Sequence, residues 1–406
     1  DMSCDKRARE VEYGADQVPN ASVAGPRARV SGRDEGETRT EGIITALGNH
    51  VYGSANYPIE RGSPAAEFRG MGPYALAEML AGRDARGRTR VEVARLGMAA
   101  QGQITMAGGM HTGSDFTYVT SELMNRELRR EYDQHTPSWD MISQIRAASD
   151  FRTIYAPQVG GDFTLRPVNE HGEYEGTTLT DEGESYRVAR YGREVNVTFE
   201  LVVNDDLGML ARLPQTFANT ARLLEDRIVW ELINGNANLS DGTAFFASSR
   251  GNVASSGGAI SATTIGAGRE AMMLQRRPGA EADREDIIVA YPNLLIVPHT
   301  LETKALQFLE KIYPEQPSNA TPAIHMRLQL LVVPFLSATF ANGSNTAWYL
   351  HDQRLPAVQA SRLQGYDAPM VSTEETRSPK GITYTAEHMF GAGLVEPRGT
   401  YKNAGS

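Results

Sequence analysis

Cysteine and lysine are among the residues that this sequence has least of. The one cysteine, Cys4, cannot form a disulfide within the chain, and thiolate zinc sites are excluded for the same reason. A single cysteine in a polar end segment is typical of a protein that matures in a reducing compartment. Most basic residues are arginine, whose planar guanidinium suits bidentate contacts with carboxylates at subunit interfaces. The only lysines are Lys6, Lys304, Lys311, Lys380 and Lys402.

An excess of positive charge and long apolar runs are also missing. The formal net charge is -10 over 406 residues, whereas proteins that coat nucleic acid are usually basic. No apolar run is long enough to cross a bilayer, and no signal-peptide pattern is present. These absences argue against a membrane role and against general nucleic-acid binding. The chain begins at Asp1 rather than Met, which we interpret as trimming or, preferably, as cleavage of a precursor.

Histidines and serines do not occur in catalytic or metal-binding patterns. The eight histidines are scattered, without the i,i+4 pairing on a helix that a metalloprotease needs. The G-x-S-x-G nucleophile pattern is missing, and Ser248, Ser249, Ser255 and Ser256 occur in segments that we expect to be loops. We therefore predict no catalytic residues.

Three further motifs have simpler interpretations than a binding site. Gly266-Ala-Gly268 lacks the third glycine of a dinucleotide loop and is interpreted as a helix start. The pair Asp205-Asp206 is expected to cap a helix. The acidic tract Glu170–Glu184 lacks the spacing of a calcium loop. The sequence thus predicts no cofactor and no metal site.

The first 114 residues are predicted to be an extension. Residues 1–60 are rich in Gly, Arg and Glu and show little apolar periodicity, which indicates an extended or partly disordered arm. Short helices are predicted around 74–80 and 91–98, and both need a partner to be stable. From Asp115 onward the pattern changes, and 116–130 has the apolar spacing of a helix.

A long antiparallel hairpin is predicted over 160–192, followed by a half-buried strand. Apolar and polar residues alternate over 195–203, which is the period of a strand. Upstream of it, two apolar groups bracket an acidic tip that contains glycine, so we expect them to pair. A two-stranded ribbon is marginally stable alone, and we predict that its apolar side chains contact a neighbouring copy. These assembly residues are Phe163, Leu165, Leu179, Tyr186, Val188 and Tyr191.

A helix is predicted over 206–234, because apolar residues recur every three or four positions in a single stripe. Asn234-Gly235 is a stop signal, and Pro214 is expected in the first turn of its main segment, where proline is tolerated. The predicted core residues of this helix, together with Ala221, are Leu210, Leu213, Phe217, Leu224, Ile228 and Leu232.

The remainder of the chain mixes both element types. Helices are expected over 263–276 and 300–312, and the continuous apolar run at 328–333 is typical of a central strand. This interleaving indicates an α+β or mixed α/β fold. Further strands are predicted at 287–290, 294–297, 348–350 and 382–388.

An ordered series of segments resembles the major capsid proteins of tailed bacteriophages, above all the Mu-like head subunits that are often encoded as protease–capsid fusions. The series begins with LTDEGESYRVARYGRE at 179–194, VVNDDLG at 202–208 and RLPQTFANTARLLED at 212–226. It continues with SDGTAFF at 240–246, RGN at 250–252 and LLIVPHTLE at 294–302. The resemblance covers about 115–400, and it rests on the order of the segments, since no single motif is diagnostic.

This resemblance implies an α+β fold, shared by tailed-phage capsids, encapsulins and the herpesvirus capsid floor. Residues 1–114 would be an N-terminal extension, a possible remnant of a scaffold or protease linker, and 115–159 an N-arm with the start of the peripheral domain. The remaining units would be the extended loop 160–192 over a neighbouring subunit, the peripheral domain 193–261 with spine helix 206–234, the axial domain 262–354, and the return strands 355–406.

The implied function is structural, without enzyme activity. Copies of the chain would form hexamers and pentamers of an icosahedral shell around double-stranded DNA, in the virion and after assembly in the host cytoplasm. Further partners would be a portal, a scaffold or maturation protease, and decoration proteins. The Lys–Asn bond that joins subunits in one branch of the family is not expected, because 160–192 contains no lysine.

Three alternatives have different discriminating observations. An encapsulin-like compartment would share the fold but enclose an enzyme instead of a genome. A capsid-associated protease would need a nucleophile, and the sequence offers no candidate. An Arg-rich nucleic-acid-binding protein is disfavoured by the acidic balance of the chain.

Overall fold

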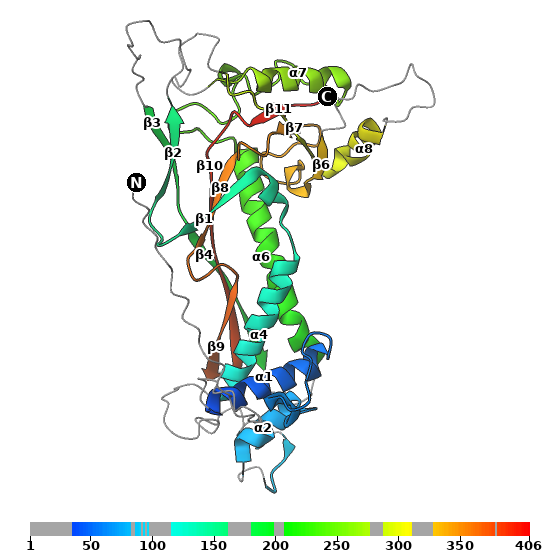
Figure 1. The fold of residues 1–406 in the computed structure, drawn as a ribbon, viewed down its shortest axis with the longest axis vertical. Coiled ribbons are helices and arrows are strands. Elements are labelled where there is room, and N and C mark those ends of the chain that lie inside the picture. Colours follow the sequence, from blue (N-terminus) through cyan, green and yellow to red (C-terminus); the bar gives the residue numbers. More distant parts are fainter. Residues whose placement is uncertain are drawn as a thin grey trace, which may run out of the picture.

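The computed structural model of the chain describes residues 35–82, 86–90, 92–93, 96, 115–160, 180–198, 207–276, 287–310, 328–377 and 380–406. Two helices, α4 (Asp115–Gln134) and α6 (Leu207–Gly235), run along the long axis of an elongated molecule (Figure 1). A small sheet lies at one end, and α1 (Glu35–Tyr52) and α2 (Pro73–Ala81) lie at the other. The mixture of helices and sheets is the α+β class that the sequence predicts.

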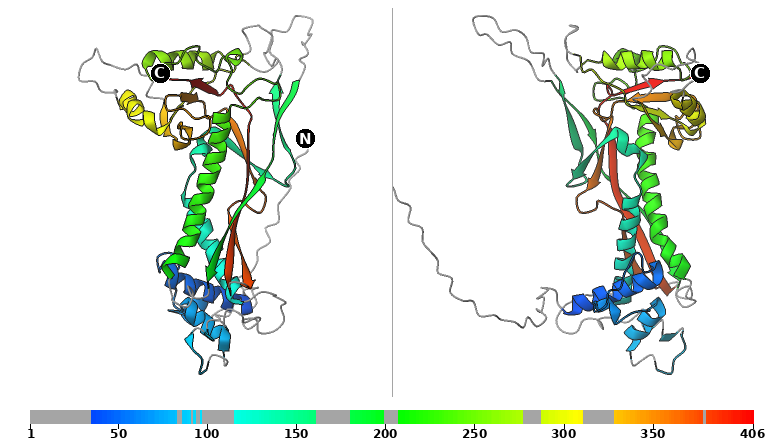
Figure 2. Two further views of the ribbon diagram at one scale, coloured as in Figure 1. Left: turned by 180° about the vertical axis from the view of Figure 1, so that it is seen from behind. Right: turned by 45° about the vertical axis from the view of Figure 1, so that its right-hand side comes forward.

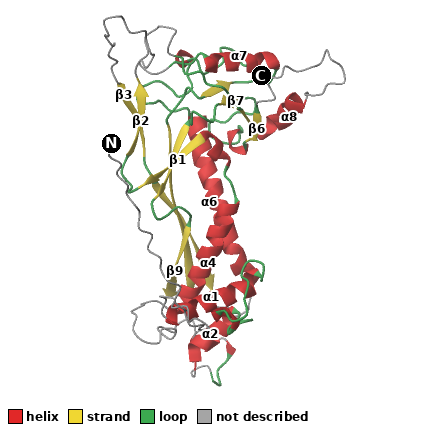
Figure 3. Cartoon of the chain, viewed as in Figure 1, coloured by secondary structure: helices red, strands yellow, loops and turns green. Residues whose placement is uncertain are grey.

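A long, five-stranded sheet lies beside α4 and α6, in the strand order β1-β8-β10-β4 with β9 also paired to β10 (Figure 3). Strand β10 is its centre, because it pairs antiparallel with β4, β8 and β9. The edge strand β1 pairs parallel with β8 only. The bounds are β1 (Ser143–Ala148), β4 (Ala189–Thr198), β8 (Val358–Leu363), β9 (Met370–Arg377) and β10 (Lys380–Leu394).

The small sheet has four strands in the order β11-β7-β5-β6 and is flanked by two helices (Figure 1). Ser261 begins α7 as a capping box, in which its hydroxyl accepts from the Thr264 amide and Thr264 accepts from the Ser261 amide. A Cβ at Gly268 would approach the Tyr401 ring to 2.8 Å, so glycine allows α7 to pack closely on β11. The bounds are β5 (Leu294–Val297), β6 (Gln329–Val332), β7 (Trp348–His351), β11 (Thr400–Asn403), α7 (Ala262–Met273) and α8 (Glu302–Glu310).

Several predictions for the second half of the chain need correction. The apolar run 328–333 forms β6, which is an edge strand rather than a central one, with partly exposed side chains. Residues 287–290 contribute only an isolated bridge, between Ile287 and Arg276. The return strands 355–406 divide between the two sheets, because β11 completes the small sheet. Predicted strands at 294–297, 348–350 and 382–388 are confirmed as β5, β7 and part of β10.

The N-terminal region differs most from its prediction. Instead of belonging to an arm, residues 35–52 form α1, and Ile43, Ile44 and Leu47 are buried in a core with α2 and α4. Glycines and charged residues between these positions lower the apparent periodicity, although the buried positions keep the i, i+1, i+4 spacing of one helix face. The predicted helix at 74–80 is confirmed as α2. Most of the predicted helix at 91–98 lies outside the described residues.

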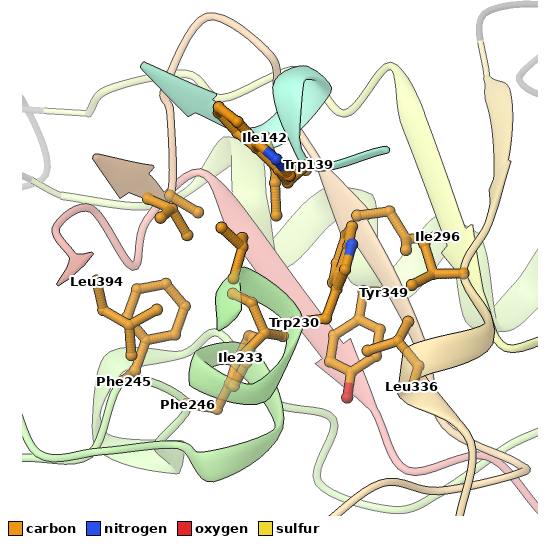
Figure 4. Close-up of a cluster of buried hydrophobic side chains, with 14 of the residues drawn as sticks. Trp139, Ile142, Trp230, Ile233, Phe245, Phe246, Ile296, Leu336, Tyr349 and Leu394 are labelled. Atoms are coloured by element: carbon orange, nitrogen blue, oxygen red, sulfur yellow. The ribbon is translucent and has the colours of Figure 1, made fainter. Parts of the chain in front are cut away.

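Helix α6 spans almost the predicted range but contains Pro214 two turns from its start, not in the first turn. A proline there removes one backbone hydrogen bond within the helix. At the other end of α6, Trp230 and Ile233 enter a core with Trp139, Phe245 and strands of both sheets (Figure 4). This core joins the helix to the two sheets. Short 3-10 helices connect the elements at η1 (Pro64–Ala66), η3 (Ser138–Ile142), η4 (Ser248–Arg250), η5 (His299–Leu301) and η8 (Pro334–Leu336).

Candidate assembly surfaces

A two-stranded ribbon, formed by β2 (Ile154–Gly160) and β3 (Thr180–Tyr186), projects at the end of the molecule far from α1 and α2 (Figure 2). The strands pair antiparallel from Ile154 opposite Tyr186 to Gly160 opposite Thr180. In the described part of the chain, neither strand has another neighbour in a sheet. The ribbon therefore begins before the predicted 160–192 hairpin and ends at residue 186.

The predicted contact residues of the hairpin fall in different parts of the molecule. Tyr191 belongs to β4, where it pairs with His388 in the long sheet. Val188 is buried with Ala148, Leu363 and Met389. The remaining three, Phe163, Leu165 and Leu179, lie outside the described residues.

Tyr186 is buried at the base of the ribbon, within its own subunit. Its hydroxyl lies 2.6 Å from Ser361 Oγ and donates to Gln359 Oε1 at 3.0 Å. Burial raises the pKa of Tyr186, so it stays a neutral hydrogen-bonding group. A Cβ at Gly393 would meet the Tyr186 side chain at 2.7 Å, which shows how closely the sheet packs there. The expectation that Tyr186 and Val188 are free to contact a neighbour is wrong, because the chain's own sheet already covers them.

Three other apolar side chains are exposed where the chain enters the ribbon. Ile145 on β1, Phe151 in the following turn and Tyr155 on β2 are 49%, 48% and 69% exposed. Sequence reasoning missed them, because none of them belongs to a long apolar pattern. Strand β1 is also open along one edge within the described residues, so its backbone groups remain available for pairing.

A carboxylate holds the ribbon against the loop that follows α6. Glu184 of β3 accepts hydrogen bonds from the Ser240 amide at 2.9 Å and from the Ser240 hydroxyl at 2.8 Å. Both residues are on the surface, so the contact orders the base of the ribbon without burying a charge. Asp241, next in the chain, forms an ion pair with Arg250 at 2.6 Å, which orders the same loop.

The predicted core residues of the spine helix form the edges of its buried face rather than its middle. Leu213 and Phe217 pack, half-buried, against the core shared with α1 and α4, and Ile228 and Leu232 pack against the core around Trp230. Leu224 is also half-buried, and the side chain of Leu210 lies outside the described residues. Fully buried positions on the same helix include Ala218, Ala221, Glu225, Val229 and Ile233.

Glu225, at the middle of that face, has no access to solvent and joins four elements. Its carboxylate accepts from Tyr132 of α4 at 2.5 Å, and both Nε and Nη2 of Arg362 of β8 donate to it at 3.2 Å. His388 of β10 lies 2.8 Å away through Nε2, and Arg222 of α6 donates at 3.2 Å. We call this group the Glu225 junction. A hydrophobic pattern cannot predict it, because every member is polar.

The Glu225 junction keeps its carboxylate ionised. Burial raises the pKa of Glu225, but the hydrogen bond from His388 and the charge of Arg362 outweigh burial and lower that pKa to about 2. Arg222 also lies over the Tyr132 ring at 3.5 Å and donates to the Tyr132 carbonyl at 2.8 Å. This arrangement connects α4 and α6 to the long sheet, and its role is structural.

The candidate chemical motifs of the sequence do not form a site in the described residues. No group of three or more His, Cys, Asp or Glu side chains in that part is arranged to hold a metal ion. Gly266 and Gly268 lie inside α7 rather than in a phosphate-binding loop. Asp205 and Asp206 are outside the described residues. Among the described helices, none has the length and hydropathy needed to cross a bilayer.

A protein-family model described as "Phage capsid protein" matches residues 181–403, which is more than half of the chain. The chain belongs to this phage capsid protein family. It is therefore a structural capsid protein of the virion, a subunit that assembles in many copies into a shell. The resemblance of the sequence to tailed-phage major capsid proteins is confirmed, whereas its Mu-like character stays a prediction.

Solved structures similar to this capsid subunit include phage capsids and a virus-like particle from Pyrococcus furiosus. The capsid of Ralstonia phage GP4 is 11% identical with a TM-score of 0.45, over 66% of this chain and 88% of that one. A structure of Microbacterium phage Oxtober96 is 11% identical with a TM-score of 0.44, and the match covers 66% of this chain and 91% of that one. The virus-like particle from Pyrococcus furiosus is 10% identical with a TM-score of 0.39, and the match covers 70% of this chain and 98% of that one. The encapsulin-like alternative is not better supported than a phage capsid. No curated protein matches the chain.

Proposed function

We propose that copies of this chain form the hexamers and pentamers of an icosahedral shell that encloses double-stranded phage DNA. The observation that carries the proposal is the β2–β3 ribbon, which has two strands and no third partner among the described residues. Isolated two-stranded ribbons are at best marginally stable in water. A neighbouring subunit that covers the ribbon supplies the missing packing.

The contact would use the exposed apolar residues at the ribbon base, Ile145, Phe151 and Tyr155. Fully burying an exposed apolar side chain contributes about 1.5–3 kcal/mol, and each of these side chains would contribute less than that, because each is already partly covered. These residues take the place of Tyr186 and Val188, which the subunit buries itself. The Glu184–Ser240 contact supports the proposal, because it orders the ribbon before a neighbour arrives and so reduces the entropy lost on docking.

In this proposal the ribbon, at one end of an elongated subunit (Figure 1), lies on a different surface of its neighbour. Such heterologous contacts close into rings or continue into larger assemblies, as a shell of hexamers and pentamers requires. In this proposal α6 is the spine of a peripheral domain, and the small sheet is the centre of an axial domain that meets its copies at the capsomer axis. Strand β11 belongs to the axial domain.

The partners follow from the same proposal. A portal, a scaffold or maturation protease, and decoration proteins would bind the shell, which assembles in the host cytoplasm. The enclosed DNA is held without sequence specificity, and a net charge of -10 is compatible with this, because packaged DNA brings its own counterions. Subunits are not joined by a Lys–Asn bond through 160–192, where lysine is missing.

Electron microscopy of the purified chain tests the proposal. We expect uniform closed shells from the wild type, and separate subunits or capsomers from a Phe151→Ser, Tyr155→Ser double variant. Tyr118→Ser on α4 is the matched control, because Tyr118 is 58% exposed and remote from the ribbon in the fold. Closed shells from the double variant would contradict the ribbon contact, and dispersed wild-type monomers at high concentration would contradict the shell itself.

A further inference from the structure

A strained valine lies on the surface of the small-sheet end. Val289 has a φ of +55°, a left-handed conformation that is strained for a β-branched residue. The other described non-glycine residues with positive φ are Asn236 and Asn342, and asparagine tolerates this region. Val289 is 37% exposed. A large apolar side chain is therefore kept in a costly backbone conformation at the surface.

Hydrogen bonds on both sides of Val289 hold this conformation. The Ile288 amide donates to the Gln275 carbonyl at 2.9 Å, and the Tyr291 amide donates to Asp352 Oδ2 at 2.7 Å. The Val289 carbonyl accepts from Arg354 Nη2 at 3.3 Å. Strain persists where surrounding structure determines it from several directions. The segment is therefore fixed in place rather than free to relax.

Asp352 is the group that organises this region. Its carboxylate is almost completely buried, and Arg354 reaches it through Nε at 3.0 Å and through Nη2 at 2.7 Å. The Arg354 guanidinium lies 5.4 Å from the centroid of the Tyr291 ring. The buried negative charge is thus paired with an exposed positive one, and Arg354 keeps Tyr291 in a fixed orientation.

The resulting surface is apolar and rigid. The antiparallel bridge between Arg276 and Ile287, together with the hydrogen bond from the Ile288 amide to the Gln275 carbonyl, places the end of α7 beside the segment that contains Val289. Leu274 is 58% exposed and Tyr291 is 41% exposed. Tyrosine and arginine are enriched among the residues that dominate protein–protein contacts, and Leu274 adds exposed apolar area. We define the Val289 corner as Leu274, Val289, Tyr291 and Arg354.

We propose that the Val289 corner is a contact with a second copy of this chain, an inference that rests on the proposed assembly into a shell. A second copy is the occupant because the family to which the chain belongs builds shells from many copies. Nucleic acid fits less well, because the one cation of the corner is already paired with Asp352 and three of its four members are apolar or aromatic. The partner surface is apolar and lacks an unpaired charge.

Because Val289 is strained, a substitution at this position can distinguish an effect on the folding of the subunit from an effect on its assembly. Val289→Gly removes the β-branched side chain and permits the positive φ, so the unassembled subunit should melt at the same temperature or higher. We expect the same variant to need at least a tenfold higher concentration to form shells. Unchanged assembly together with a higher melting temperature would overturn the proposal.

A second variant removes the apolar area without touching the strain. We expect Leu274→Ser with Tyr291→Ser to melt like the wild type and to raise the assembly concentration tenfold or more, measured by light scattering and electron microscopy. Leu223→Ser, at a 56% exposed position on α6, is the control and should assemble normally. An equal loss in this control would overturn the specific role of the corner.

The two proposals fail in different ways. A wild-type chain that forms no closed particles overturns the shell and the corner together. A wild type that assembles, alongside corner variants that assemble at the same concentration, overturns the corner alone. Wild-type shells with impaired corner variants and a normal Leu223→Ser variant support both.

Discussion

Two buried carboxylates, one at each of two helix contacts, have opposite electrostatic outcomes. Glu225 of α6 and Glu127 of α4 are both fully shielded from solvent. Glu225 is surrounded by two arginines, a histidine and a tyrosine, and its pKa falls to about 2. Glu127 accepts from Tyr57 at 3.3 Å and from Arg130, and burial, the larger effect, raises its pKa. The number of donors, not burial alone, decides whether a carboxylate stays charged.

The regions around Glu127 and Glu225 also differ in how many polar contacts they contain. Around Glu127, α1 and α2 pack on α4 mainly through an apolar core, and two nitrogens of Arg130 are buried with no partner in the described part of the chain. Around Glu225, the contact between α6 and the long sheet is centred on charges with good geometry. The first region should therefore tolerate the loss of its carboxylate, and the second should not.

The largest expected effect is that of Glu225→Ala. The change leaves the largely covered side chains of Arg222 and Arg362 without the buried carboxylate that pairs them, so we expect a loss of about 3–5 kcal/mol in the free energy of unfolding of the unassembled subunit. Urea unfolding measures it. Glu231→Ala, which removes an exposed partner of Arg227, is the control and should cost less than about 1 kcal/mol. A loss below 1 kcal/mol for Glu225→Ala would remove the basis of the comparison.

Leu47→Ala should have the next largest effect, because Leu47 is fully buried in the core that α1 forms with α4. Truncation of a buried leucine costs about 2–5 kcal/mol. Hydrogen exchange of α1 and α2 amides should accelerate more than exchange in the small sheet, which localises the change. Uniform acceleration would show that the two regions are not separable.

Acid should weaken the Glu225 junction at a defined pH. The folded-state pKa of about 2 lies below the ordinary value of 4.5, so the unfolded chain binds this proton first. The contribution of Glu225 is then complete above pH 4.5 and is lost as the pH falls through about 2. In Glu225→Gln the stability should fall less steeply over this window, as measured by urea unfolding at a series of pH values. A parallel pH profile would contradict the assignment.

Glu127→Gln should have the smallest effect, under about 1 kcal/mol at neutral pH, because the neutral amide avoids the burial of a charge. The raised pKa of Glu127 reverses the sign of its linkage. The contribution of Glu127 to stability is complete below pH 4.5 and is lost as the pH rises through the folded-state pKa. The stability of the variant relative to the wild type should therefore improve as the pH rises from 4.5. A loss of several kcal/mol at neutral pH would contradict this view.

Local sequence patterns predicted the elements that have one buried face and one exposed face. Alternation over 195–198 and the apolar stripe of α6 correspond to a strand and a helix that are each half covered. The same stripe misplaces the buried face of α6 by about one residue, because Glu225 lies at its centre and no hydrophobicity scale assigns glutamate to a core. The burial of Glu225 is explained by its tertiary contacts with Arg362 and His388, which are far away in the sequence.

The candidate contact surfaces were less predictable. Tyr186 and Val188 are apolar residues beside a ribbon, and the sequence cannot reveal that β8 and β10 cover them. Tyr155 and Tyr291 are isolated aromatics in the sequence, and only their exposure in the fold distinguishes them from core residues. The sequence does not indicate the positive φ of Val289, because that conformation depends on hydrogen bonds that Gln275 and Arg354 form with this segment.

The position of β11 bears on when a subunit becomes competent to assemble. This strand pairs with β7, and its Tyr401 packs under α7. Every other strand is synthesised earlier, so the small sheet stays open at one edge until translation has passed residue 403. Nascent chains therefore cannot present a complete small sheet to one another before residue 403 has been synthesised.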